Sequence, residues 1–178
     1  MKLFGWKSAG RAAARPALAR GLTGWIGGHW PRAYEAQLRE LYLTNSVAQR
    51  AVRLVAEGVA SIVIRASAPM AGDLVAATSG GQSLMETLAI SLLLHGNGYV
   101  QILPDTHGAP AELFALRPER VSIEADPRGW PMAYRYRAGE VTSLLSADSV
   151  IHIRVHHPLD DHYGLGCLDD RPPLSGPR

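Results

Sequence analysis

An apolar run between residues 84 and 94 constrains the fold more than any other feature of this sequence. Ser83 precedes the run and Glu86 follows three residues later, which is the capping-box pattern that begins a helix. Gly96 comes just after the run and is the residue type that most often ends one. Apolar residues occupy nearly every side of this helix, so it must lie inside a core. Any fold of the chain has to enclose it.

A second helix is predicted from Ser46, because apolar residues recur at three- and four-residue spacing as far as Val59. Ser46 is its expected N-cap. Four polar residues form the solvated side of this helix: Gln49, Arg50, Arg53 and Glu57. We expect its apolar side to contact the first helix through Val52, Val55, Leu88 and Leu92. Residues 62–64 are predicted to form a short strand, and residues 69–81 a loop.

After Gly98 the sequence favours strands separated by short turns that contain Pro, Asp or Gly. The strands are expected at Tyr99–Leu103, Ala111–Leu116, Val121–Glu124, Met132–Arg137 and Val150–Val155. Strands joined in this way favour an antiparallel meander. With the two helices packed on it, the sequence predicts an α+β fold.

The composition is that of an ordinary globular protein, with 47% hydrophobic and 19% charged residues and a net charge of +2. Cys167 has no second cysteine to pair with, and no apolar run approaches the roughly 18 residues of a membrane span. No export signal is recognisable. These features predict a cytoplasmic protein without a membrane partner.

The first 33 residues form a flexible basic arm in this interpretation, because no acidic residue precedes Glu35. Its basic residues are Lys2, Lys7, Arg11, Arg15, Arg20 and Arg32. The arm could contact phosphate groups, or it could be a solvated, disordered tail. A transit peptide is a third interpretation, which the tryptophans and glycines of this segment fit poorly.

Six potential metal ligands lie close together near the end of the chain: His152, His156, His157, Asp160, Asp161 and His162. Side chains alternate along a strand, so Arg154 shares a face with His152 and His156. No closed set of three or four donors is evident. We therefore predict a polar strand edge and loop that bind no metal tightly, with a metal-dependent hydrolase as a minor alternative.

Two glycine motifs were considered as phosphate-binding loops. Gly96-Asn97-Gly98 follows a helix and precedes a strand, which is the reverse of the order that such a loop requires. Gly164-Leu165-Gly166 follows a strand, but a third glycine and a following helix are missing. Cys167 has no oxyanion motif, and His95 is expected to be a helix-end residue. No catalytic, cofactor-binding or metal-binding residue is predicted.

One strand alternates Tyr134 and Tyr136 with Arg135 and Arg137. The tyrosines could stack on the bases of a single-stranded nucleic acid, or they could form the buried side of a sheet whose other side is solvated. The first possibility, together with the basic arm, makes a small nucleic-acid-binding module the main alternative function.

The order of several segments resembles the HK97-type portal proteins of tailed phages. The segments are "AVRLVAEGVASIVI", "LLLHGNGYVQIL", "GAPAELFALRPERVSI", "YRY", "DSVIHIRV" and "PLDDHYGLG". The resemblance implies a structural subunit without enzymatic activity or cofactor, with residues 34–168 forming a portal wing-like domain. It also implies a dodecameric ring at a capsid vertex of a phage, prophage or gene transfer agent.

The partners implied by this resemblance are further copies of the subunit, terminase, capsid and head–tail adaptor proteins, and the double-stranded DNA in the channel. The implied location is the virion or the host cytoplasm. Residues 169–178 are expected to form an irregular tail of a truncated or frame-shifted product, because Pro172, Pro173 and Pro177 forbid the helix that the family has there. Such a product is expected to be monomeric or weakly associating.

Overall fold

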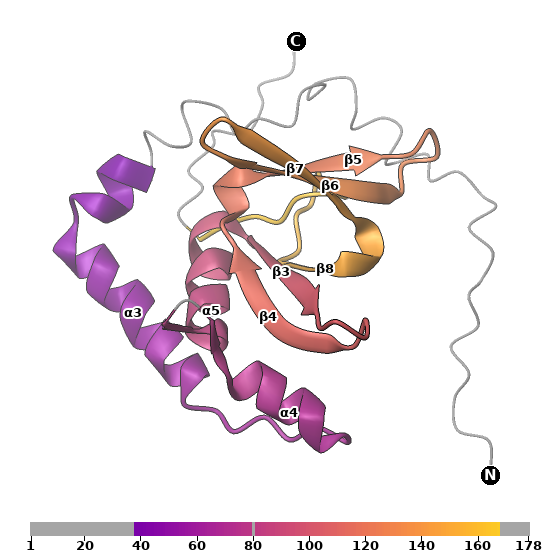
Figure 1. The fold of residues 1–178 in the computed structure, drawn as a ribbon. Coiled ribbons are helices and arrows are strands. Elements are labelled where there is room, and N and C mark those ends of the chain that lie inside the picture. Colours follow the sequence, from indigo (N-terminus) through magenta and orange to yellow (C-terminus); the bar gives the residue numbers. More distant parts are fainter. Residues whose placement is uncertain (1–37, 80, 168–178) are drawn as a thin grey trace.

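The computed structural model describes residues 38–79 and 81–167 of the chain. Helices lie on one side of this part and two small antiparallel sheets on the other, so the predicted α+β class is confirmed (Figure 1). The expected arm (1–33) and the expected tail (169–178) lie outside the described residues.

The helical side is built around α5 (Leu84–His95), which the sequence placed correctly. The Oγ atom of Ser83 accepts a hydrogen bond from the backbone N–H of Glu86 at 3.4 Å, and Gly96 ends the helix at φ 68°. Helix α3 (Ser46–Ala60) packs along α5 and is preceded by a π-helical turn, η1 (Arg39–Leu43). Helix α4 (Pro69–Ala76) follows α3 and lies near α5 and β4.

The strands form two three-stranded sheets where a single meander was expected. In the first sheet, β3 (Asn97–Pro104) pairs with both β4 (Pro110–Leu116) and β8 (Val150–Arg154). The second sheet is a meander of β5 (Val121–Ala125), β6 (Pro131–Ala138) and β7 (Val141–Ser146). A two-stranded ribbon, β1 (Thr78–Ser79) with β2 (Gln82–Ser83), precedes α5, and the single turns η2 (Pro118–Arg120) and η3 (Ala147–Ser149) link the two sheets.

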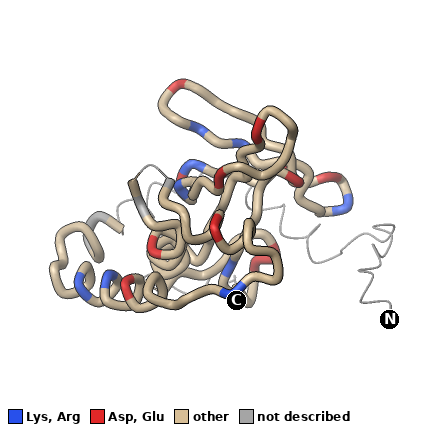
Figure 2. The backbone as a smooth tube through the Cα atoms, turned by 60° about the horizontal axis from the view of Figure 1, so that its bottom comes forward, with Lys and Arg blue, Asp and Glu red and all other residues tan. Residues whose placement is uncertain are grey.

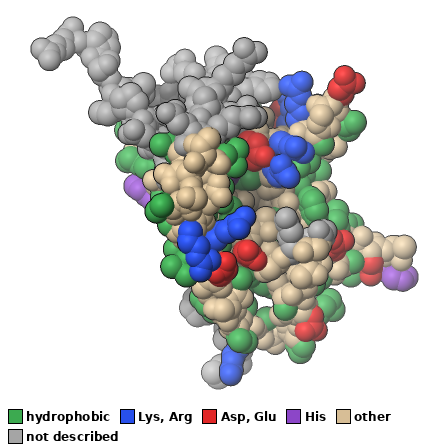
Figure 3. Space-filling model, turned by 90° about the vertical axis from the view of Figure 1, so that its left-hand side faces the viewer, with side chains coloured by type: hydrophobic (Ala, Val, Ile, Leu, Met, Phe, Trp, Pro, Cys, Tyr) green, Lys and Arg blue, Asp and Glu red, His purple; other side chains and the backbone are tan. Residues whose placement is uncertain are grey.

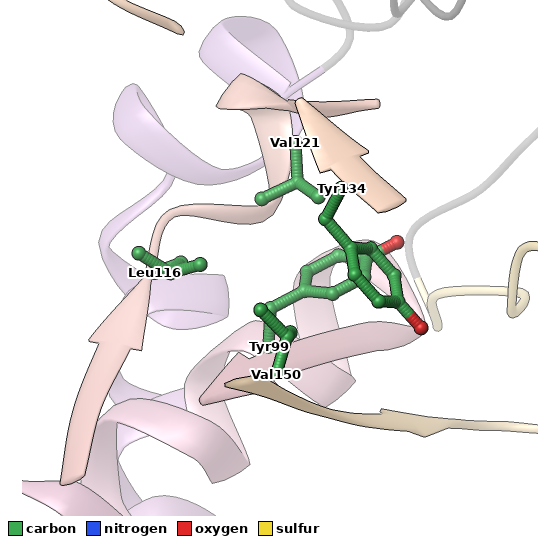
Figure 4. Packing of buried hydrophobic residues seen from close by; sticks show 5 residues of the cluster. All are labelled: Tyr99, Leu116, Val121, Tyr134 and Val150. Carbon is green, nitrogen blue, oxygen red and sulfur yellow. The ribbon is translucent and has the colours of Figure 1, made fainter. Parts of the chain in front are cut away.

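Two groups of buried side chains hold these layers together. Between the sheets lie Tyr99, Leu116, Val121, Tyr134 and Val150 (Figure 4). Between α5 and the first sheet lie Leu84, Leu88 and Val100. Helix α5 is thus buried against both α3 and a sheet, as its apolar sequence required.

Four local expectations are wrong, and each has a physical reason. Residues 62–64 form no strand, because no neighbouring strand pairs with them in the described part of the chain. Pro69 begins a helix where a loop was expected, since proline is well suited to the first helical turn. Asn45, and not Ser46, caps α3 by accepting hydrogen bonds from the N–H groups of Val47 and Ala48. Strand β7 was not predicted, because its sequence VTSLLS shows no clear alternation.

The expected contact between the two helices is confirmed only in part. Val52 and Leu88 are buried and Leu92 is half-buried, whereas half of the Val55 side chain is exposed. Val55 therefore does not belong to the core, and the apolar pattern of α3 extends beyond the side that faces α5.

Candidate functional site

The two glycine motifs of the sequence meet at the C-terminal end of α5. Residues 164–167 pack against Gly96 and the last turn of the helix, although they lie more than sixty residues later in the sequence. We call the contact between Gly96–Gly98 and residues 164–167 the glycine junction. Neither motif is expected to bind phosphate on sequence grounds, but the two motifs pack backbone against backbone.

Glycine is required in the junction because backbone meets backbone there. A Cβ atom on Gly164 would overlap the carbonyl oxygen of Gly96, and one on Gly96 would overlap the backbone of Gly164 and Leu165. A Cβ atom on Gly166 would overlap the carbonyl oxygen of Leu94. Gly96 also has a positive φ, which favours glycine independently of these contacts.

The side chain of Asn97 is the polar centre of the junction and is fully buried. Its Oδ1 atom accepts a hydrogen bond from the Gly164 N–H at 2.8 Å. Its Nδ2 group donates to the carbonyl oxygen of His95 at 2.8 Å and to that of Gly164 at 3.4 Å. A buried amide with all these partners fixes the two chain segments in one relative position.

His152 on β8 completes the network. Its Nε2 atom lies 3.2 Å from Asn97 Oδ1, and because an amide oxygen only accepts, Nε2 carries the hydrogen. The imidazole ring stacks on the ring of Tyr99, with centroids 4.3 Å apart. Burial, with smaller contributions from Arg154 and His162, lowers the pKa of His152 to about 4. The ring is therefore neutral at pH 7 and acts as a packing and hydrogen-bonding group.

The segment on either side of Gly164 is fixed by further contacts. The carbonyl oxygen of Leu93 accepts hydrogen bonds from the N–H and the Sγ of Cys167, at 2.8 and 2.9 Å. The Val155 N–H donates to the Gly96 oxygen at 2.8 Å. Tyr163 accepts a hydrogen bond from the Ile123 N–H at 3.2 Å and so links the junction to the second sheet. The last carbonyl groups of α5 thereby find partners that a helix end lacks by itself.

The six residues considered as metal ligands are used separately. His152 is partly buried in the junction, and Asp160 accepts hydrogen bonds from the N–H groups of His162 and Tyr163. The Nδ1 atom of His157 accepts one from the Leu159 N–H. In residues 38–79 and 81–167, no three or more His, Cys, Asp or Glu side chains gather as a metal-binding group.

His95, in the last turn of α5, is also buried, and burial lowers its pKa to about 4. Its Nε2 atom lies 3.8 Å from Oε2 of Glu119, but a neutral imidazole forms no ion pair with this carboxylate. The two side chains line a pocket of about 480 Å³ between α5, β4 and η2, together with Arg117 and Arg120. The prediction of a helix-end position for His95 is correct, whereas its burial could not be read from the sequence.

Tyr134 is not available to stack on nucleic-acid bases. It is buried between the sheets, edge-on to Tyr99 with ring centroids 5.8 Å apart. Arg135, on the opposite face of β6, forms an ion pair with Glu124. Along the backbone of the described part of the chain, basic and acidic positions are interspersed (Figure 2). The alternation in β6 therefore marks a buried and a solvated side of a sheet.

The glycine junction is thus a close helix–loop joint that is held together by hydrogen bonds of Asn97 and His152. Both glycine motifs are visible in the sequence, but their contact with each other is not. The signal that could have revealed this contact is the glycine content that both motifs share. Glycines allow two backbone segments to approach closely.

This chain is similar in sequence to known proteins. Residues 46–170 match the family described as phage portal protein. A protein of Rickettsia felis of uncharacterised function is 28% identical over 151 residues, and one of Rickettsia bellii is 24% identical over 148 residues. Each alignment covers 73% of this chain and 38% of the relative.

Solved structures give the same result. The neck of a native gene transfer agent particle, computed with C12 symmetry, contains a chain that is 31% identical with a TM-score of 0.72, covering 84% of this chain and 42% of that one. The virion of a native gene transfer agent particle gives 31% identity and a TM-score of 0.71, covering 85% and 44%. The chain therefore spans less than half the length of the relatives that it matches.

Proposed function

Because this chain belongs to the phage portal protein family, we propose that it is a structural part of a portal ring, which forms the DNA conduit and head–tail connector at one vertex of a capsid. The family match over residues 46–170 is the observation that carries this proposal. The similarity to chains in the neck and virion of gene transfer agent particles supports it.

The described residues fit a structural role. His95 is buried and His152 is partly buried, and both are neutral at pH 7. Asn97 uses its polar atoms to hold two chain segments together. These groups stabilise a fixed shape, whereas an acid–base catalyst needs a group with access to substrate and a pKa near the working pH. We propose that residues 34–168 form one wing-like unit of the ring and have no enzymatic activity.

The proposed partners are further copies of the subunit, double-stranded DNA in the channel, terminase during packaging, and capsid and head–tail adaptor proteins. The proposed location is the particle, with the host cytoplasm as the site of synthesis. No helix in the described part of the chain is long and apolar enough to cross a membrane.

The experiment that tests this proposal is an epitope fusion of the chain, expressed in its natural host under conditions that induce particle formation. Immunogold microscopy of purified particles should show the label at a single vertex of each particle. If the fused chain stays in the soluble fraction and is absent from the particles, the proposal is wrong. A fusion of the Gly164→Ala variant serves as the control, because a misfolded chain should not be incorporated.

A further inference from the structure

Helix α3 has two apolar sides, and among the described residues only one of them is buried. Val52 and Ala56 are buried on the side that faces α5. A second set lies on the opposite side, within one stripe about 17 Å long, and consists of Val47, Ala51, Leu54, Val55 and Gly58. Val47 is 77% exposed, Leu54 59% and Val55 50%, and a Cβ atom on Gly58 would meet no other atom within 4 Å. We call this set the α3 stripe.

The charged residues of α3 lie beside the stripe and not on it. They are Arg50, Arg53 and Glu57, with Arg50 Nη1 3.3 Å from Glu57 Oε1. Figure 3 looks onto the α3 side of the molecule and shows hydrophobic side chains next to a group of basic and acidic ones. An apolar stripe with a charged border is typical of a protein–protein contact, because its centre excludes water while its rim stays solvated.

A second apolar surface lies on β8, at the free edge of the first sheet. Ile151, Ile153 and Val155 alternate along one face and are 41–44% exposed, and Leu159 beyond them is 78% exposed. We call these four residues the β8 row. The acidic residues Asp160 and Asp161 follow it directly, and Asp161 is exposed. In Figure 1, α3 and β8 lie on opposite sides of α5.

We propose that the α3 stripe of one copy of this chain contacts the β8 row of the next copy, head to tail. This inference rests on the proposed ring function. A cyclic assembly needs two different surfaces on every subunit, one for each neighbour. The chain in the C12-symmetric neck has the same fold at a TM-score of 0.72, so a second copy of this chain is the occupant that the comparison favours.

The net charges at the borders of the two surfaces have opposite signs. The border of the α3 stripe carries two arginines and one glutamate, whereas the β8 row adjoins two aspartates, Asp160 and Asp161, and one arginine, Arg154. Opposite charges on the rim orient the two copies as they approach, and this effect weakens as salt is added. Contact between two α3 stripes, or between two β8 rows, would instead bring borders with the same net charge together.

Two variants of the full chain, mixed with each other, test the head-to-tail arrangement. Leu54→Asp disables the α3 stripe and Ile153→Asp disables the β8 row, and each substitution should weaken self-association about tenfold or more. The mixture should form a 1:1 dimer and nothing larger, because one intact surface of each kind remains. Sedimentation over a wide concentration range, with photo-crosslinking from position 54, measures both effects.

Controls keep the test independent of folding. Leu159→Asp changes a more exposed residue of the β8 row and should reproduce the effect of Ile153→Asp. Met132→Asp changes an exposed apolar residue outside both surfaces and should leave association unchanged. Circular dichroism and thermal unfolding should show every variant folded.

Each outcome separates this inference from the proposed function. Three results would each show that the inference is wrong, even when the tagged chain enters particles. Leu54→Asp could associate like the original chain, the mixture could form no dimer, or the original chain could give no crosslink between copies. If the mixed dimer forms but the tagged chain is absent from particles, the two surfaces bind each other and the proposed portal function is wrong.

Discussion

The glycine junction and the α3 stripe differ in which residues they bury and which they expose. The junction buries Asn97 and partly buries His152, both of them polar, among glycines that have no side chains. The stripe leaves valine and leucine exposed on a well-formed helix. Polar residues can be buried where two backbone segments pack closely, provided that their hydrogen bonds are made. The apolar pattern of a helix extends beyond the core when the helix has a second apolar side.

The largest expected effect comes from a single methyl group in the junction. Gly164→Ala should lower the free energy of unfolding by about 4 kcal/mol or more, because the new Cβ atom overlaps the Gly96 carbonyl oxygen and neither backbone can move freely. The matched control is Gly58→Ala in the α3 stripe, where the space is open and alanine is the better helix former. That change should raise stability by about 0.5–1 kcal/mol. Urea unfolding of both variants decides whether the two regions differ as described.

A similar contrast is expected between two apolar side chains. Leu88→Ala should cost about 2–5 kcal/mol, because Leu88 is buried between α5 and the first sheet. Val55→Ala should cost less than about 1 kcal/mol, because half of that side chain is already in water. Thermal unfolding measures both. Equal losses would mean that Val55 is part of the core after all.

Asn97→Ala tests whether the polar network, and not glycine packing alone, holds the junction. It removes the acceptor of the Gly164 N–H and of His152 Nε2, and it leaves the His95 carbonyl oxygen without this donor. We expect a loss of about 2–4 kcal/mol. Hydrogen exchange at Gly164 and Cys167 should accelerate more than exchange in α3. An unchanged exchange rate at Gly164 would show that Asn97 contributes nothing to the joint.

A pH dependence of stability is expected from two histidines. His95 and His152 have a pKa near 4 in the folded protein and an ordinary value of 6.5 when unfolded. Between these values the unfolded chain binds more protons, so stability is complete above about pH 6.5 and falls as the pH decreases toward 4. The loss should reach about 2 kcal/mol or more. A chain with His95→Gln and His152→Gln should show a flatter profile over this interval, measured by urea unfolding. A profile as steep as that of the original chain would contradict the assignment to these two histidines.

Several elements could be predicted from sequence because their signals are local. Ser83, Glu86 and Gly96 marked both ends of α5, and the turns placed five of the strands to within one or two residues. The resemblance to portal proteins rested on the order of such segments and is confirmed by the family match. Strand β7 and helix α4 were missed because their sequences carry only weak patterns and tertiary contacts decide their state.

The sequence by itself determined the central helix, the α+β class and the family, since capping, periodicity and turn chemistry act between near neighbours. Only the tertiary structure decided which apolar residues are buried, how the strands divide between two sheets, and what the glycine motifs do. Gly96 and Gly164 are far apart in the sequence, and folding brings the backbone of each against the other. This close approach is the reason why both positions require glycine. The roles of Asn97 and His152 follow from the same meeting, because a hydrogen-bond partner more than fifty residues away leaves no local pattern.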